Sequence, residues 1–126
     1  MNHKLYPWQS SCLKRWFAND GRGIVQAVTG SGKTFLALTA AWQLEQKLGK
    51  TLHVKIVVPT SSLLWQWNRA LREFIRSSGR PHKKIGLRGD GCKSSADCPY
   101  MIYVINSARY ELARQILSEI RQGKPV

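Results

Sequence analysis

Acidic side chains are scarce in this sequence of 126 residues. Seven Asp and Glu stand against 20 Lys and Arg, which gives a formal net charge of +13 at pH 7. Such an excess of cations favours a polyanionic partner, most simply DNA or RNA. An anionic membrane surface is the competing interpretation, but the sequence contains no lone amphipathic helix with flanking lysines to support it.

Long apolar runs are missing, and cysteines are few. No stretch approaches the length of a membrane span, and the first 20 residues contain no signal-peptide core. The three cysteines, Cys12, Cys92 and Cys98, are an odd number, which favours free thiols. A zinc site that joins His82 to Cys92 and Cys98 is an alternative, although their spacing is not that of a zinc finger. We therefore expect an intracellular, reducing location in the cytoplasm and no membrane partner.

Apolar periodicity predicts an alternation of helices and strands. The 43% hydrophobic content fits one folded domain. Four helices are expected: at 7–18, at 33–48, one that begins after a cap at 60–62, and one at 109–121. Strands are expected at 23–26, 54–59, 85–87 and 100–105, with a loop at 88–98. This alternation is typical of an α/β fold with a parallel sheet and right-handed crossovers.

Two of the predicted helices have distinct faces. In the helix that follows 60–62, one face is apolar and another is basic with one aromatic residue; the basic face consists of Trp65, Arg69, Arg72 and Arg76. That face is either a solvated surface or part of a nucleic-acid interface. The last helix has one apolar side, formed by Ala113, Ile116, Leu117 and Ile120.

The segment Ala27–Thr34 has the pattern of a phosphate-binding loop between a strand and a helix. Backbone N–H groups of Thr29, Gly30, Ser31 and Gly32 would converge on a phosphate, and the start of the helix adds unpaired donors. Lys33 would reach the β and γ phosphates of ATP, and the Thr34 hydroxyl would bind Mg²⁺. The alternative is a glycine-containing turn that only connects a strand to a helix.

The order of these motifs resembles the first RecA-like motor domain of superfamily 2 helicases and translocases, in the DEAD/DEAH-like group that includes type III restriction subunits. The resemblance covers essentially all 126 residues. The segment Leu5–Gln9 is similar to the family's Q-type motif, and this implies that Gln9 contacts adenine. A polar residue in the first turn of a helix is the alternative for Gln9.

The resemblance also implies residues that hold nucleic acid. The segment Val57–Thr60 is similar to motif Ia, which places Thr60 near a backbone phosphate. Capping of the helix by Thr60 is compatible with that role. The segment Ile102–Ala108 resembles a later strand-and-turn motif and implies that Asn106 and Ser107 contact the strand. Arg69 is a further candidate on the basic face.

One element of the family's pattern is missing: an Asp-Glu box that holds Mg²⁺ and orients the attacking water. No two acidic residues are adjacent here. We therefore expect the N-terminal part, 1–126, of a single RecA-like domain, truncated before the strand that carries the acidic box. The remainder of the motor would be its partner. Such a chain would bind ATP, Mg²⁺ and DNA or RNA but hydrolyse ATP poorly.

Two other functional classes remain open. A non-catalytic nucleic-acid-binding module could keep the phosphate-binding loop as a relic. A small-molecule kinase would also carry such a loop, but its acidic substrate site is hard to build from so few carboxylates.

Overall fold

The computed structural model describes residues 5–25, 32–77, 84–94 and 98–126. The helices are α1 Pro7–Ala18, α2 Lys33–Leu48, α3 Ser61–Ser77 and α4 Ile105–Arg121; the strands are β1 Val54–Val58, β2 Ile85–Gly89, β3 Cys92–Lys93 and β4 Tyr100–Val104. The strands form one sheet in the order β1-β4-β2-β3. Strands β1, β4 and β2 are parallel, and only the short β3 is antiparallel. The expected α/β fold with a mainly parallel sheet flanked by helices is therefore confirmed.

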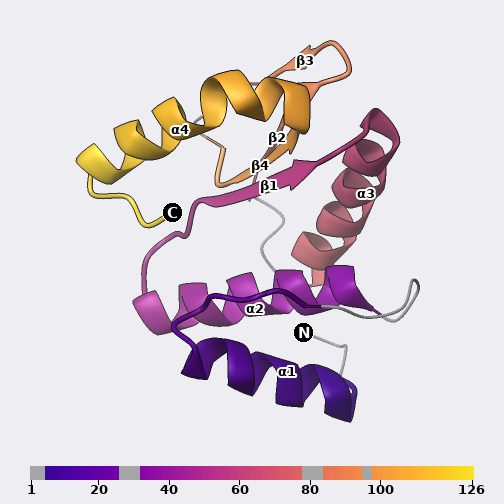
Figure 1. Cartoon of the computed structure of the whole chain (residues 1–126), viewed down its shortest axis with the longest axis vertical. Coiled ribbons are helices and arrows are strands. Elements are labelled where there is room, and N and C mark those ends of the chain that lie inside the picture. Colours follow the sequence, from indigo (N-terminus) through magenta and orange to yellow (C-terminus); the bar gives the residue numbers. More distant parts are fainter. Residues whose placement is uncertain (1–4, 26–31, 78–83, 95–97) are drawn as a thin grey trace.

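Helices cover both faces of this sheet (Figure 1). Side chains of β4 alternate between the two faces, as the pleat requires. Tyr100 and Ile102 join the cluster that contains α3, whereas Met101 and Tyr103 pack with Ala108 of α4. The result is three layers, α4, sheet and α3.

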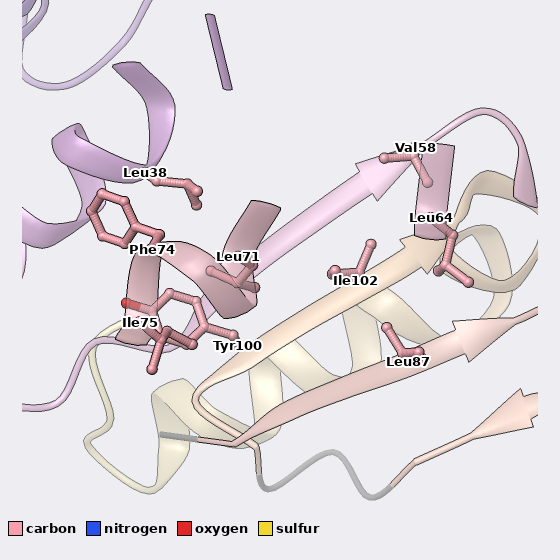
Figure 2. Packing of buried hydrophobic residues seen from close by; sticks show 9 residues of the cluster. All are labelled: Leu38, Val58, Leu64, Leu71, Phe74, Ile75, Leu87, Tyr100 and Ile102. Carbon is pink, nitrogen blue, oxygen red and sulfur yellow. The ribbon is translucent and has the colours of Figure 1, made fainter. Parts of the chain in front are cut away.

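The main core lies between α3 and the sheet and extends to α2. Figure 2 shows Leu64 and Leu71 of α3 above the strands, and Phe74 of α3 beside Leu38 of α2. On its other side, α2 packs through Leu36 against α1. Because α2 is apolar on more than one face, it can be covered by two neighbours at once. This arrangement sets the start of α2 between α1 and α3.

The predicted strand at 23–26 is wrong for its described part. Residues 22–25 pair with no strand in the described part of the chain, and Ile24 is 90% exposed. A strand gains stability only by pairing its backbone groups with a neighbour, and apolar residue type cannot supply that neighbour. Gln26 and residues 27–31 lie outside the described part of the chain.

Two further boundaries differ from the sequence-based expectation. Helix α4 begins at Ile105, directly after β4, so Asn106 and Ser107 lie in its first turn and not in a connecting turn. The expected loop at 88–98 contains a hairpin, in which Asp90 and Gly91 connect β2 to β3. Asp-Gly is a typical pair for a tight hairpin turn, because both central residues adopt positive φ.

Helix α4 packs on the sheet through Ala108 and Leu112, which contact Met101 and Tyr103 of β4, and through a polar stripe. The polar stripe consists of Glu111, Gln115 and Glu119, which are spaced one helical turn apart and bind residues of the sheet. The predicted apolar side is largely exposed, with Leu117 54% and Ile120 58% exposed. Each member of the polar stripe has its partner on a different strand. None of the helices within the described ranges has the length and hydrophobicity needed to cross a bilayer.

Candidate nucleotide and nucleic-acid site

The described part of the phosphate-binding loop forms the start of α2. Gly32 is the residue before the helix and has φ +95°, a left-handed conformation that glycine adopts at little cost. Lys33 and Thr34 then form the first turn of α2, where backbone N–H groups lack intrahelical partners. Thr29, Gly30 and Ser31 lie outside the described residues. The structure thus places Lys33 and Thr34 at the positive end of a helix of 16 residues.

Gln9 lies directly against this helix start. Its side-chain amide donates a 3.2 Å hydrogen bond to the Gly32 carbonyl, across 23 residues of sequence. Its Oε1 accepts a 2.8 Å bond from the Tyr6 N–H at the beginning of α1. The Gln9 side chain is 1% exposed. Two segments that sequence analysis assigned to the nucleotide are therefore brought into contact.

The approach of Gln9 requires glycine at position 32. A Cβ built on Gly32 would lie 2.6 Å from Gln9 Nε2, closer than nonbonded atoms approach each other. Two features therefore favour glycine at position 32: its positive φ and the proximity of the Gln9 carboxamide, which leaves no space for a Cβ.

Two grooves open beside the start of α2. One, of about 900 Å³, lies between α2 and α3 and is lined by Gly32, Lys33, Thr34 and Glu73 among others. The other, of about 470 Å³, is almost entirely apolar and lies between α1, α2 and β1, with Lys33, His53 and Lys55 at its border. A triphosphate needs cations, backbone donors and a hydroxyl, and the first groove brings Lys33, Thr34 and the helix start together.

Three of the residues predicted to contact nucleic acid lie at the carboxyl edge of the sheet. Val58 of β1 pairs with Val104 of β4, and Thr60 and Asn106 each lie two residues beyond that pair. Thr60 caps α3, because its Oγ1 accepts a 3.2 Å bond from the Leu63 N–H. Asn106 Oδ1 accepts a 2.9 Å bond from Arg109. Thr60, Asn106 and the adjacent Ser107 thus share one edge, as parallel strands require.

Arg69 lies apart from this edge. It is exposed on α3, nine residues after Thr60, which corresponds to about 14 Å along a helix. It belongs to the basic face of α3, together with Trp65, Arg72 and Arg76, all of which are exposed.

The sequence did not predict a hydrogen bond made by Trp65, at the N-terminal end of the basic face of α3. The Trp65 indole Nε1 donates a 2.7 Å hydrogen bond to Asp90 Oδ2, in the turn between β2 and β3. The Asp-Gly pair was a signal for the hairpin, but nothing in the sequence indicated that the hairpin would reach α3.

The polar layer under α4 was also missed. Glu111 binds Arg88 of β2 at 3.0 Å, Gln115 accepts the Tyr103 hydroxyl of β4, and Glu119 binds Lys55 of β1. His53 Nδ1 lies 3.4 Å from the second Glu119 oxygen. The spacing of Glu111, Gln115 and Glu119 was the available signal, because residues four apart share one helix face.

Burial affects the ionisation of Tyr103 in this layer. Loss of water around the phenol, together with the negative charge of Glu119, raises the pKa of Tyr103 from 10.0 to about 12. The neutral phenol is therefore the form that the fold favours.

Several of the scarce carboxylates serve the fold. Glu45 accepts a 2.8 Å bond from the Leu52 N–H, and Asp90, Glu111 and Glu119 hold Trp65, Arg88 and Lys55. In the groove at Lys33 and Thr34, the acidic lining residue is Glu73. The three cysteines are free thiols, each half-buried.

Comparison with known proteins agrees with this geometry. A family model described as the res subunit of type III restriction enzymes matches residues 2–124. No curated protein matches the chain.

Proposed function

The chain belongs to the family of type III restriction enzyme res subunits, and from that premise we propose that it binds ATP with Mg²⁺ at the start of α2 and a nucleic-acid strand at the carboxyl edge of the sheet. The family is one of ATP-dependent, helicase-like motor domains, which use ATP and Mg²⁺ and act on nucleic acid. The assignment of these roles to individual residues is our proposal.

The observation that carries the proposal is the contact between Gln9 and Gly32. It joins the residue proposed for adenine to the residues proposed for phosphate, so that one nucleotide can reach both. Lys33 binds the β and γ phosphates, and Thr34 ligates Mg²⁺. Backbone N–H groups of Thr29, Gly30, Ser31 and Gly32 complete the phosphate site.

Gln9 has hydrogen-bonding capacity left for adenine. A carboxamide carries two N–H donors and two oxygen lone pairs, and the bonds to Gly32 and Tyr6 use one of each. The remaining donor and acceptor match the N7 and N6 groups of adenine. Because Gln9 is 1% exposed, this contact needs a small shift of the start of α1.

Thr60, Asn106 and Ser107 are proposed to hold the strand backbone, and Arg69 to add a cationic contact. Hydroxyls, amides and helix-start N–H groups are suitable phosphate donors and carry no sequence information. The net charge of +13 supports such a partner by attracting a polyanion to the whole molecule.

Hydrolysis by these 126 residues is proposed to be slow. No two carboxylates are adjacent in the sequence, and four of the seven hold structural bonds. A motor needs carboxylates that bind Mg²⁺ and orient water, in addition to the lysine and the hydroxyl. We therefore propose nucleotide binding with little turnover.

Titration with a fluorescent ATP analogue, with Mg²⁺ present, tests the nucleotide site. Lys33→Ala should weaken binding by about 10- to 100-fold, because it removes a charge-assisted contact to phosphate. Lys50→Ala is the matched control, since Lys50 is an exposed lysine just beyond α2. Equal affinities of the two variants would contradict the site.

The alternative function, a nucleic-acid-binding module with a relic loop, gives a different result in the same assay. It is favoured by the structural use of the carboxylates. Strand binding that ignores both ATP and Lys33→Ala would support the module, whereas strand affinity that responds to ATP supports the motor.

A further inference from the structure

Trp65 is held in a fixed position on the surface. It lies in the second turn of α3 and is 43% exposed, so a substantial part of a large aromatic side chain faces solvent. Its indole N–H is bound to Asp90 at 2.7 Å, across 25 residues of sequence. A side chain that already has its rotamer fixed loses little entropy when a ligand stacks on it.

The hairpin that holds Trp65 is itself anchored. Asp90 has φ +49° in the turn after β2. The preceding Gly89 lies so close to β4 that a Cβ there would approach Val104 Cγ2 to 2.5 Å. The Asp90 carboxylate is therefore presented from a packed strand end and can fix the indole.

Cations continue from Trp65 along the same face of α3. Arg69, Arg72 and Arg76 follow at the spacing of successive helical turns, and all three are exposed. Arg72 and Arg76 also line a groove of about 470 Å³ together with Lys84. An aromatic ring at one end of a cationic track is the combination with which proteins bind single-stranded nucleic acid.

We propose that Trp65 is a stacking platform for an unpaired base of single-stranded nucleic acid, whose backbone runs along Arg69 and the arginines that follow it. This inference rests on the proposed nucleic-acid binding and adds a contact to a base, where Thr60, Asn106 and Ser107 contact only the backbone. Asp90 acts through Trp65 as a positioning residue.

Fluorescence anisotropy with two labelled strands of equal length tests the platform. One strand carries thymine bases, and the other is an abasic sugar-phosphate strand, at one fixed salt concentration. Trp65→Ala should weaken binding of the thymine strand by about 5- to 150-fold and leave the abasic strand unchanged. Arg69→Ala should weaken both strands, because it removes a phosphate contact.

Three variants control for other causes. Trp65→Phe keeps an aromatic face and should retain most of the affinity for the thymine strand. Trp8→Ala removes an exposed tryptophan from α1 and should change neither strand. Asp90→Ala and Asp90→Asn both remove one negative charge, but only Asn keeps an acceptor for the indole. Asp90→Ala should therefore bind the thymine strand more weakly than Asp90→Asn does.

The outcomes separate this inference from the proposed function. If the unmodified chain binds both strands and Trp65→Ala binds them equally well, the platform is refuted and backbone binding stands. If Trp65→Ala weakens both strands equally, the residue serves the backbone or the fold, and the platform is again refuted. If the unmodified chain binds neither strand, the proposed nucleic-acid function fails together with the platform.

Discussion

At the residue scale, the contact between Gln9 and Gly32 links the start of α1 to the start of α2. It depends on a residue without a Cβ at position 32, both for its φ of +95° and for the space that Gln9 Nε2 occupies. The contact therefore couples the position of a buried carboxamide to the backbone that precedes Lys33.

We predict that Gly32→Ala destabilises the chain more than Gly49→Ala does. Both glycines flank α2 with positive φ, but a Cβ on Gly49 meets open space. Each substitution should lower the free energy of unfolding by about 1–2 kcal/mol through backbone strain. Gly32→Ala should cost about 1 kcal/mol more, since it displaces the Gln9 amide. Urea unfolding measures both.

A double variant identifies the cause of this difference. In a Gln9→Ala background the side chain that Cβ would displace is gone, so the extra cost of Gly32→Ala should disappear. Equal losses for the two glycines in the unmodified chain would show that the contact with Gln9 contributes nothing to stability.

The sequence indicated which residues form the candidate site but not the contacts between them. Gln9, Lys33 and Thr34 were identified one by one, from spacing and from a resemblance. The Gln9–Gly32 bond depends on how α1 crosses α2, and that angle is set by the packing of Leu13 against Leu36 and Ala40. A pattern within one segment cannot specify the angle between two.

At the element scale, α4 is attached to the sheet by hydrogen bonds and ion pairs, in addition to the apolar contacts of Ala108 and Leu112 with β4. The helix crosses β2, β4 and β1 in turn, and Glu111, Gln115 and Glu119 each meet a partner on one strand. The Lys55–Glu119 pair is buried, whereas the Arg88–Glu111 pair is partly exposed. Buried polar groups are stable only when they are paired, so the pairs of Glu119 fix the position of the helix on the sheet most firmly.

We predict that Tyr103 makes the stability of the chain fall between pH 10.0 and about 12. Because its pKa is raised in the fold, the phenol stabilises the folded state fully below pH 10.0, and this contribution is lost as the pH rises through about 12. Tyr103→Phe removes the contribution, so the difference in unfolding free energy between it and the unmodified chain should shrink over this range. Urea unfolding at a series of pH values, with tyrosinate absorbance, follows both quantities.

Tyr6→Phe provides the reference for this experiment, because it removes a largely exposed phenol from the N-terminal side of α1. A stability difference between Tyr103→Phe and the unmodified chain that stays constant from pH 10.0 to 12 would contradict the assigned pKa.

Some helices and strands could be predicted from local sequence signals, whereas others depend on contacts between distant parts of the chain. Helices at 7–18 and 33–48 and the strand that begins at Val54 were predicted closely, because apolar spacing and caps are local signals. The strand at 23–26 was wrong over its described residues, 23–25, because strand pairing is not a local signal. The start of α4 at Ile105 was placed four residues late, since Asn106 and Ser107 suit a turn as well as the first turn of a helix.

At the scale of the whole molecule, exposed apolar surface and high positive charge act against each other. Leu117 and Ile120 on the outer side of α4 are more than half exposed, and β1 is an edge strand of the sheet that the described residues form. Such surfaces favour association. A net charge of +13 opposes it, because every copy repels every other.

We predict that the chain is monomeric at low salt and associates as salt rises. The Debye length falls from about 10 Å at 0.1 M to about 3 Å at 1 M, so repulsion weakens while apolar attraction does not. The double variant Leu117→Ser with Ile120→Ser should remain monomeric in high salt, as measured by sedimentation velocity. Its unfolding free energy should change by less than about 1 kcal/mol, because both side chains face solvent.

Ile105→Ser, an equally exposed position at the other end of α4, is the control. If association persists in the double variant but disappears in Ile105→Ser, the outer side of α4 is not the self-association surface. The self-association surface would then lie at the carboxyl edge of the sheet, where the nucleic acid is proposed to bind.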